Sequence, residues 1–143
     1  MSQCKVLFAT DYSASSEMAL KHALAYAKMQ DASILVAHVL SIPSSASGEG
    51  MLHDGARFDN AETAGRKLKE VADTIGDIPC ETRLLRGEPA EQILRLADEE
   101  GVDLIAMGTV GRTGLSRLLM GSVAEQVVRQ AKCPVLTVKY APE

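Results

Sequence analysis

The order of apolar segments along the chain constrains its fold more than any other feature. Short apolar runs alternate with segments in which apolar residues recur at the spacing of a helix. The runs predict strands over residues 5–9, 33–39, 79–85, 102–107 and 134–139. The periodic segments predict helices over about 13–30, about 59–75, from Gly87-Glu88-Pro89 to a cap at Gly101, and about 122–131. The chain therefore reads as strands and helices in strict alternation.

This alternation predicts the fold class. Strands that are mostly apolar belong to a parallel sheet covered on both faces, and right-handed crossovers between them give a three-layer α/β/α sandwich. A chain of 143 residues suits one such domain over residues 1–143. The Ser/Gly-rich stretch 41–55 interrupts the pattern, which then resumes. We therefore expect a surface loop or lid there, not a domain linker.

Composition excludes several classes of protein. The net charge is −4 and no block of Lys or Arg stands out, which argues against duplex nucleic acid as a partner. The longest apolar runs are far shorter than a membrane span, and the apolar patch at residues 6–9 is too short for a signal peptide, so we expect a cytoplasmic protein. The three cysteines lack metal-ligand spacing, and Cys4 and Cys133 are expected to be buried hydrophobic residues.

The loop after the fourth expected strand is unusually rich in glycine. Four of the eleven glycines lie in or beside it, at Gly108, Gly111, Gly114 and Gly121. Glycine lets backbone N–H groups approach an anion closely. Gly121 and Ser122 stand at a helix start, where free N–H groups and the helix dipole favour phosphate, and Arg112 and Arg117 add positive charge.

A structural explanation of the same loop is open. Ser122 and Glu125 form an S-x-x-E pattern that could simply cap the helix, and glycines also serve turn geometry alone. The combination, placed between an apolar strand and a helix, favours a phosphate site. Ligands of open parallel sheets bind beyond the carboxyl ends of the strands, where the winding direction reverses.

The loop also carries a family resemblance. Gly108, Gly111, Gly121 and Ser122 fit the pattern G-x2-G-x9-G-[S/T], which resembles the motif of the nucleotide-binding universal stress proteins. Ala-Thr-Asp-Tyr-Ser at 9–13, Ala-His-Val at 37–39 and Cys-Pro-Val-Leu at 133–136 extend the likeness over the whole chain. The resemblance implies an adenine nucleotide alpha hydrolase-like, Rossmann-like fold with strand order 3-2-1-4-5. The winding then reverses between the first and fourth strands.

The resemblance also implies the ligand contacts. Phosphate and ribose would lie against Gly108, Gly111, Gly121, Ser122 and Val123, and adenine near Ala9, Asp11, Val39 and Met107. We add Arg112 to the candidate site for its positive charge in the same loop. The aromatic content of 3% implies that adenine packs between aliphatic side chains. Val110 and Ala9 depart from the residues frequent in the family. The ligand therefore stays open among ATP, ADP, AMP and a cyclic nucleotide, with or without Mg²⁺.

The residues favour binding over catalysis. The glycine loop lacks the lysine of a P-loop, the first strand–helix turn lacks the glycines of a dinucleotide fingerprint, and the third strand ends without the carboxylate of a receiver domain. His38 is expected to be packed and His53 exposed, while Asp11 either contacts the ligand or caps a helix. No nucleophile–base pair is visible, so we expect slow ATP hydrolysis at most.

The predicted function is an ATP-binding stress or regulatory module that forms a homodimer. The resemblance implies antiparallel pairing of the last strand, from Pro134 to Lys139, across a twofold axis. The apolar edge of this strand fits such pairing. Alternatively, Pro134 and Lys139 could keep other chains from pairing with this edge. The main alternative is a protein-interaction or chaperone-like module that works without nucleotide. An enzyme acting on other phosphorylated substrates is a third.

Overall fold

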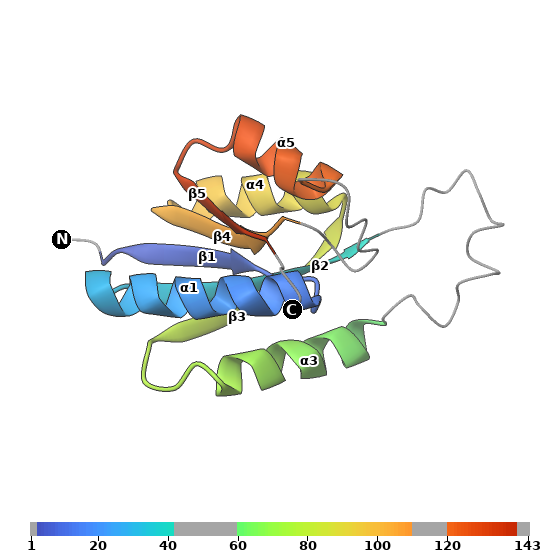
Figure 1. The fold of residues 1–143 in the computed structure, drawn as a ribbon. Helices are drawn as coiled ribbons and strands as arrows, with labels where there is room; N and C mark the ends of the chain where they lie inside the picture. Colours follow the sequence, from blue (N-terminus) through green and yellow to red (C-terminus); the bar gives the residue numbers. More distant parts are fainter. Residues whose placement is uncertain (1–2, 42–59, 110–119, 140–143) are drawn as a thin grey trace, which may run out of the picture.

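The computed structural model describes residues 3–41, 60–109 and 120–139. A five-stranded parallel sheet forms the centre of the molecule, as expected (Figure 1). Its strands are β1 (Lys5–Ala9), β2 (Ser33–Ser41), β3 (Cys80–Gly87), β4 (Leu104–Gly108) and β5 (Val135–Val138). Their order in the sheet is β3-β2-β1-β4-β5. The winding therefore reverses between β1 and β4, where the open-sheet rule locates a ligand.

Helices cover both faces of this sheet (Figure 1). One face carries α1 (Ala14–Gln30) and α3 (Ala61–Asp73), and the other carries α4 (Pro89–Glu100) and α5 (Ser122–Gln130). Alternate residues of β1 supply the two cores: Val6 and Phe8 pack with α1 and α3, whereas Leu7 packs with α4 and α5. The three-layer sandwich follows from this alternation. Among the described helices, none combines the length and the apolar character that a bilayer span requires.

The element ends agree closely with the sequence pattern. Ser13 caps α1, and its side chain accepts a hydrogen bond from the Ser16 N–H. Gly101 ends α4 in the left-handed conformation, with φ 61°. The helix expected over 59–75 is shorter, because Asn60 is its cap and α3 ends at Asp73. The fourth strand begins at Leu104, not Val102, because the Val102 N–H still bonds to the carbonyl of Ala97 in α4.

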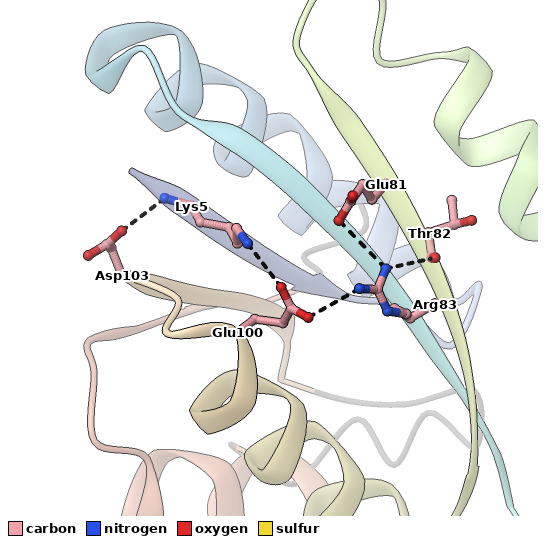
Figure 2. Close-up of polar contacts among 6 residues, drawn as sticks. All are labelled: Lys5, Glu81, Thr82, Arg83, Glu100 and Asp103. Atoms are coloured by element: carbon pink, nitrogen blue, oxygen red, sulfur yellow. Dashed lines mark hydrogen bonds and ion pairs between the residues drawn. The ribbon is translucent and has the colours of Figure 1, made fainter. Parts of the chain in front are cut away.

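A polar network joins the start of β1 to β3 and to the end of α4 (Figure 2). The Lys5 ammonium lies 3.0 Å from one carboxylate oxygen of Glu100, and the Arg83 guanidinium lies 3.1 Å from the other. The Lys5 N–H donates to the Asp103 carboxylate at 2.9 Å. Hydrogen bonding and charge from Lys5, then the charge of Arg83, lower the pKa of the Glu100 carboxyl. This network ties β1, β3 and the end of α4 together.

The two edge strands of the sheet differ in character. β3 carries exposed charged residues at Glu81 and Arg86, whereas every residue of β5 is half-buried. Cys4 and Cys133 are half-buried, so the expectation that they are buried was wrong, although each packs against a core cluster. Burial is the main cause that raises the pKa of the Cys133 thiol.

Candidate functional site

A pocket of about 330 Å³ opens at the carboxyl ends of β1, β2 and β4, beside the start of α5. Eight predicted site residues line it: Ala9, Asp11, Val39, Met107, Gly108, Gly121, Ser122 and Val123. They come from segments far apart in the sequence, which the reversal of winding brings to one place. Gly111 and Arg112 lie outside the described residues, as do Val110, Gly114, Arg117, His53 and residues 42–55 of the Ser/Gly-rich stretch.

One wall of the pocket is aliphatic. Ala9 and Met107 are buried at the ends of β1 and β4, and Val39 lies near the end of β2. Two further lining residues, Pro89 and Ile93, come from the first turns of α4. The sequence pattern assigned Ile93 to a core stripe and Pro89 to a helix start, which hid their place in the pocket. This wall suits a flat, weakly polar ring.

The start of α5 forms another part of the pocket lining. Gly121 is the N-cap with an extended backbone, φ −75° and ψ 169°, and no side chain caps this helix start. Ser122 is the first helical residue, so the capping interpretation of Ser122 and Glu125 is wrong. Within the described part of the chain, the N–H groups of Ser122, Val123 and Ala124 have no hydrogen-bond partner. Backbone donors left unpaired among the described residues at the positive end of a helix are suited to an anion.

The Gly121 turn is attached to the sheet by a short chain of hydrogen bonds. The Gly121 N–H donates to the Thr109 carbonyl at 2.6 Å, and the Thr109 N–H donates to the Val138 carbonyl at 3.1 Å. The buried hydroxyl of Ser15 donates to the same Val138 carbonyl at 3.0 Å. The free donors of α5 are therefore fixed relative to the ends of β4 and β5.

Asp11 both lines the pocket and orders the start of α1, so the two interpretations of this residue are compatible. Its Oδ1 accepts hydrogen bonds from the Ser13 N–H at 3.0 Å and the Ser16 hydroxyl at 2.9 Å. Its other oxygen, Oδ2, has no hydrogen-bond partner among the described residues. One carboxylate oxygen thus holds the start of α1, and the other makes no hydrogen bond within the described ranges.

His38 is a packed histidine, as expected. It is 4% exposed, and its Nδ1 lies 2.7 Å from the Thr10 carbonyl oxygen. Because a carbonyl only accepts, Nδ1 carries the hydrogen and is not available as a base. The Tyr12 ring lies against the imidazole, with 4.4 Å between ring centroids. Over the described ranges, His, Cys, Asp and Glu side chains nowhere gather in a group of three able to hold a metal.

Comparison with known proteins agrees with this architecture. The model of the universal stress protein family matches residues 4–139. The chain belongs to that family. Universal stress protein MJ0531 of Methanocaldococcus jannaschii is 39% identical over 139 residues, a match that covers 94% of this chain and 81% of the relative.

Two solved structures of similar proteins extend the comparison. That of MJ0577 from Methanocaldococcus jannaschii has 32% identity and a TM-score of 0.79, with each chain covered completely. A universal stress protein in complex with cAMP has 31% identity and a TM-score of 0.72, with 96% of this chain and 98% of that chain covered. The family and its Rossmann-like fold are therefore shown for this chain, and one relative at this similarity holds an adenine nucleotide.

Proposed function

We propose that this chain binds an adenine nucleotide, with ATP the first candidate, and acts as a nucleotide-responsive regulatory module in the cytoplasm. The observation that carries the proposal is the start of α5, where the first three N–H groups have no partner among the described residues and belong to residues that line the pocket. A neutral wall for a base and a positive wall for phosphate are the two parts that a nucleotide requires. The relative in complex with cAMP supports the same class of ligand.

The residues divide between the two parts of the ligand. Phosphate and ribose lie against Gly108, Gly111, Arg112, Gly121, Ser122 and Val123, and adenine lies near Ala9, Asp11, Val39 and Met107. We infer that the Asp11 Oδ2 accepts a hydrogen bond from the adenosine part of the nucleotide. Binding of this kind calls for no nucleophile, so hydrolysis is slow at most.

A thermal melt tests the proposal. At free ATP about a hundred times its Kd, binding stabilises the folded state by about 2.7 kcal/mol, which raises Tm by several degrees. The melts are run with and without millimolar ATP and Mg²⁺. Absence of any shift in the wild-type chain would contradict nucleotide binding and favour the nucleotide-independent interaction module.

Gly121→Val tests where the phosphates lie. The backbone of Gly121 is extended, a conformation that valine adopts readily, so the variant should fold and melt like the wild type without ligand. Its new side chain would occupy the approach to the free N–H groups and abolish the ATP shift. The matched control is Gly65→Val in α3, where nothing lies within 4 Å of the added Cβ. Retained ATP binding by Gly121→Val would mean that the phosphates lie elsewhere.

The identity of the nucleotide is decided by a separate measurement. Mass spectrometry of the nucleotide that copurifies with the purified protein distinguishes ATP, ADP, AMP and a cyclic nucleotide. ATP is the expected species. Recovery of a different adenine nucleotide would keep the binding site and change its assigned ligand, whereas recovery of a guanine nucleotide would contradict the adenine assignment.

The same proposal includes a homodimer through β5. The Pro134 carbonyl accepts from Ile105 in β4, and the Val138 carbonyl accepts from Thr109, directly after β4. The main-chain groups of Val135 and Thr137, which alternate with them, therefore face the open edge of the sheet. An open apolar edge favours antiparallel pairing with the same strand of a second copy. Thr137→Pro removes an outward N–H and should give a monomeric mass by light scattering, whereas Thr137→Ala should stay dimeric. A monomeric wild type at micromolar concentration would contradict the dimer.

A further inference from the structure

The turn between β1 and α1 contains a backbone conformation that calls for an explanation. Tyr12 has φ 67°, in the left-handed region that side chains other than glycine rarely adopt. The other described non-glycine residue of this kind is Asp31, which ends α1 as its C-cap. Tyr12 ends no helix. Residues held in this way persist only where their surroundings fix them.

Contacts from several elements fix Tyr12. Its hydroxyl donates to the carbonyl of Ala64 in α3 at 3.0 Å, and its ring lies against His38 of β2. The ammonium group of Lys67, which belongs to α3, lies 5.3 Å from the centroid of the Tyr12 ring. The Tyr12 N–H donates to the Thr10 hydroxyl at 2.9 Å. The side chain is therefore anchored at both its ring and its hydroxyl.

The left-handed residue shapes the pocket wall beside it. The hydrogen bond from the Ser13 N–H to the Asp11 Oδ1 closes a tight turn with Tyr12 at its middle. The left-handed conformation of Tyr12 is therefore part of the turn that fixes the carboxylate of Asp11, a residue that lines the pocket. Tyr12 itself is not among the residues that line the described pocket.

We propose that Tyr12 is a positioning residue for the adenosine end of the nucleotide site, acting through the Asp11 carboxylate. The inference rests on the proposed nucleotide binding and adds a residue that the sequence motif does not contain. It concerns one end of the ligand, because the Asp11 carboxylate belongs to the turn between β1 and α1, whereas the proposed phosphate end is built on the start of α5 and on Thr109. A residue that only packs α3 against the sheet would affect both ends alike.

The test compares three ligands by isothermal titration calorimetry: ATP, adenosine and inorganic tripolyphosphate. Tyr12→Val introduces a β-branched side chain, which resists the left-handed conformation, and removes the contacts of the ring and the hydroxyl. We expect its Kd for ATP and adenosine to rise about tenfold, and its Kd for tripolyphosphate to stay within about twofold. Tyr12→Phe keeps the ring against His38 and loses only the hydroxyl, so it should bind all three ligands almost normally. Circular dichroism verifies the fold of each variant.

A double variant tests the route through Asp11. In an Asp11→Ala background, Tyr12→Val should change the Kd for adenosine less than about twofold, because the group that it positions is gone. If Tyr12→Val does not fold, Tyr12→Gly replaces it, since glycine adopts the left-handed conformation and removes only the anchors. The same difference between adenosine and tripolyphosphate is expected.

The outcomes separate this inference from the proposed function. A wild-type chain that binds neither ATP nor adenosine would overturn both. Wild-type binding with unchanged adenosine affinity in Tyr12→Val would overturn the inference alone. Equal losses of affinity for adenosine and tripolyphosphate would assign Tyr12 a general packing role and also overturn the inference. Losses of affinity that simply add in the Asp11→Ala background would do the same.

Discussion

Gly108 is the position where the structure makes its sharpest prediction about stability. The first glycine of the motif lies at the end of β4, directly against the start of α1. A Cβ added there would collide with the Ser15 hydroxyl oxygen and would lie 2.8 Å from both the main-chain carbon and the Cβ of Ser15. Those atoms belong to a buried residue whose hydroxyl is bonded to β5. The strand and helix must therefore separate to admit alanine.

The size of the effect follows from these contacts. Moving the Cβ from 2.8 Å to an ordinary contact distance of 3.4 Å requires α1 and β4 to separate by about 0.6 Å. Overpacking a close-packed interior in this way costs about 1–3 kcal/mol. For a chain of this length we expect Gly108→Ala to lower Tm by roughly 3–9 °C, measured by circular dichroism without ligand.

A matched variant gives the opposite sign. Gly65 lies inside α3 with nothing within 4 Å of an added Cβ, so Gly65→Ala should stabilise the protein by about 0.5–1 kcal/mol. Adding Ser15→Ala to Gly108→Ala removes the collision with the hydroxyl, so the double variant should be less destabilised than the sum of the two changes. A Gly108→Ala protein that melts within a degree of the wild type would refute the reasoning from close approach.

Two further substitutions test the fold. Because Lys5 and Arg83 lower the pKa of Glu100, the ion pairs stabilise the protein above the ordinary carboxyl pKa of 4.5, and this contribution is lost as pH falls through and below that value. Glu100→Gln should therefore have a lower free energy of unfolding than the wild type in urea melts at neutral pH, and this difference should shrink in acid. A difference that grows in acid would contradict the assignment. Gly101→Ala should cost about 1 kcal/mol, because its left-handed cap at φ 61° suits glycine; an unchanged urea midpoint would contradict it.

The sheet could be predicted from the sequence because local patterns determine it. Apolar runs such as Lys5–Ala9 are buried in the sheet, and caps such as Ser13 and Gly101 mark helix ends through interactions that span only a few residues. The strand order was implied by the family resemblance, and the observed order agrees with it. The eight described site residues meet because this order brings the ends of β1 and β4 together.

The remaining features depend on contacts that sequence spacing does not encode. Ser122 fits a capping pattern, but the helix begins one residue earlier than that pattern requires, which leaves Gly121 as the cap. Ile93 shares an apolar stripe with core residues, and only its position on the assembled sheet brings it to the pocket. The bond from Tyr12 to Ala64 joins residues 52 positions apart. Such pairs form only after the layers have packed.

The unlike edges of the sheet also bear on how many copies can join. A sheet that accepts a neighbour at both sides can lengthen without limit, whereas one that accepts a neighbour at one side stops after a single addition. The charged residues of β3, Glu81 and Arg86, disfavour addition at that side, and the open groups of β5 permit it at the other. Pairing through β5 would occupy, in both copies, the one edge strand that can accept a neighbour. In the proposed dimer, β3 would therefore be the edge that keeps the assembly from growing beyond two copies.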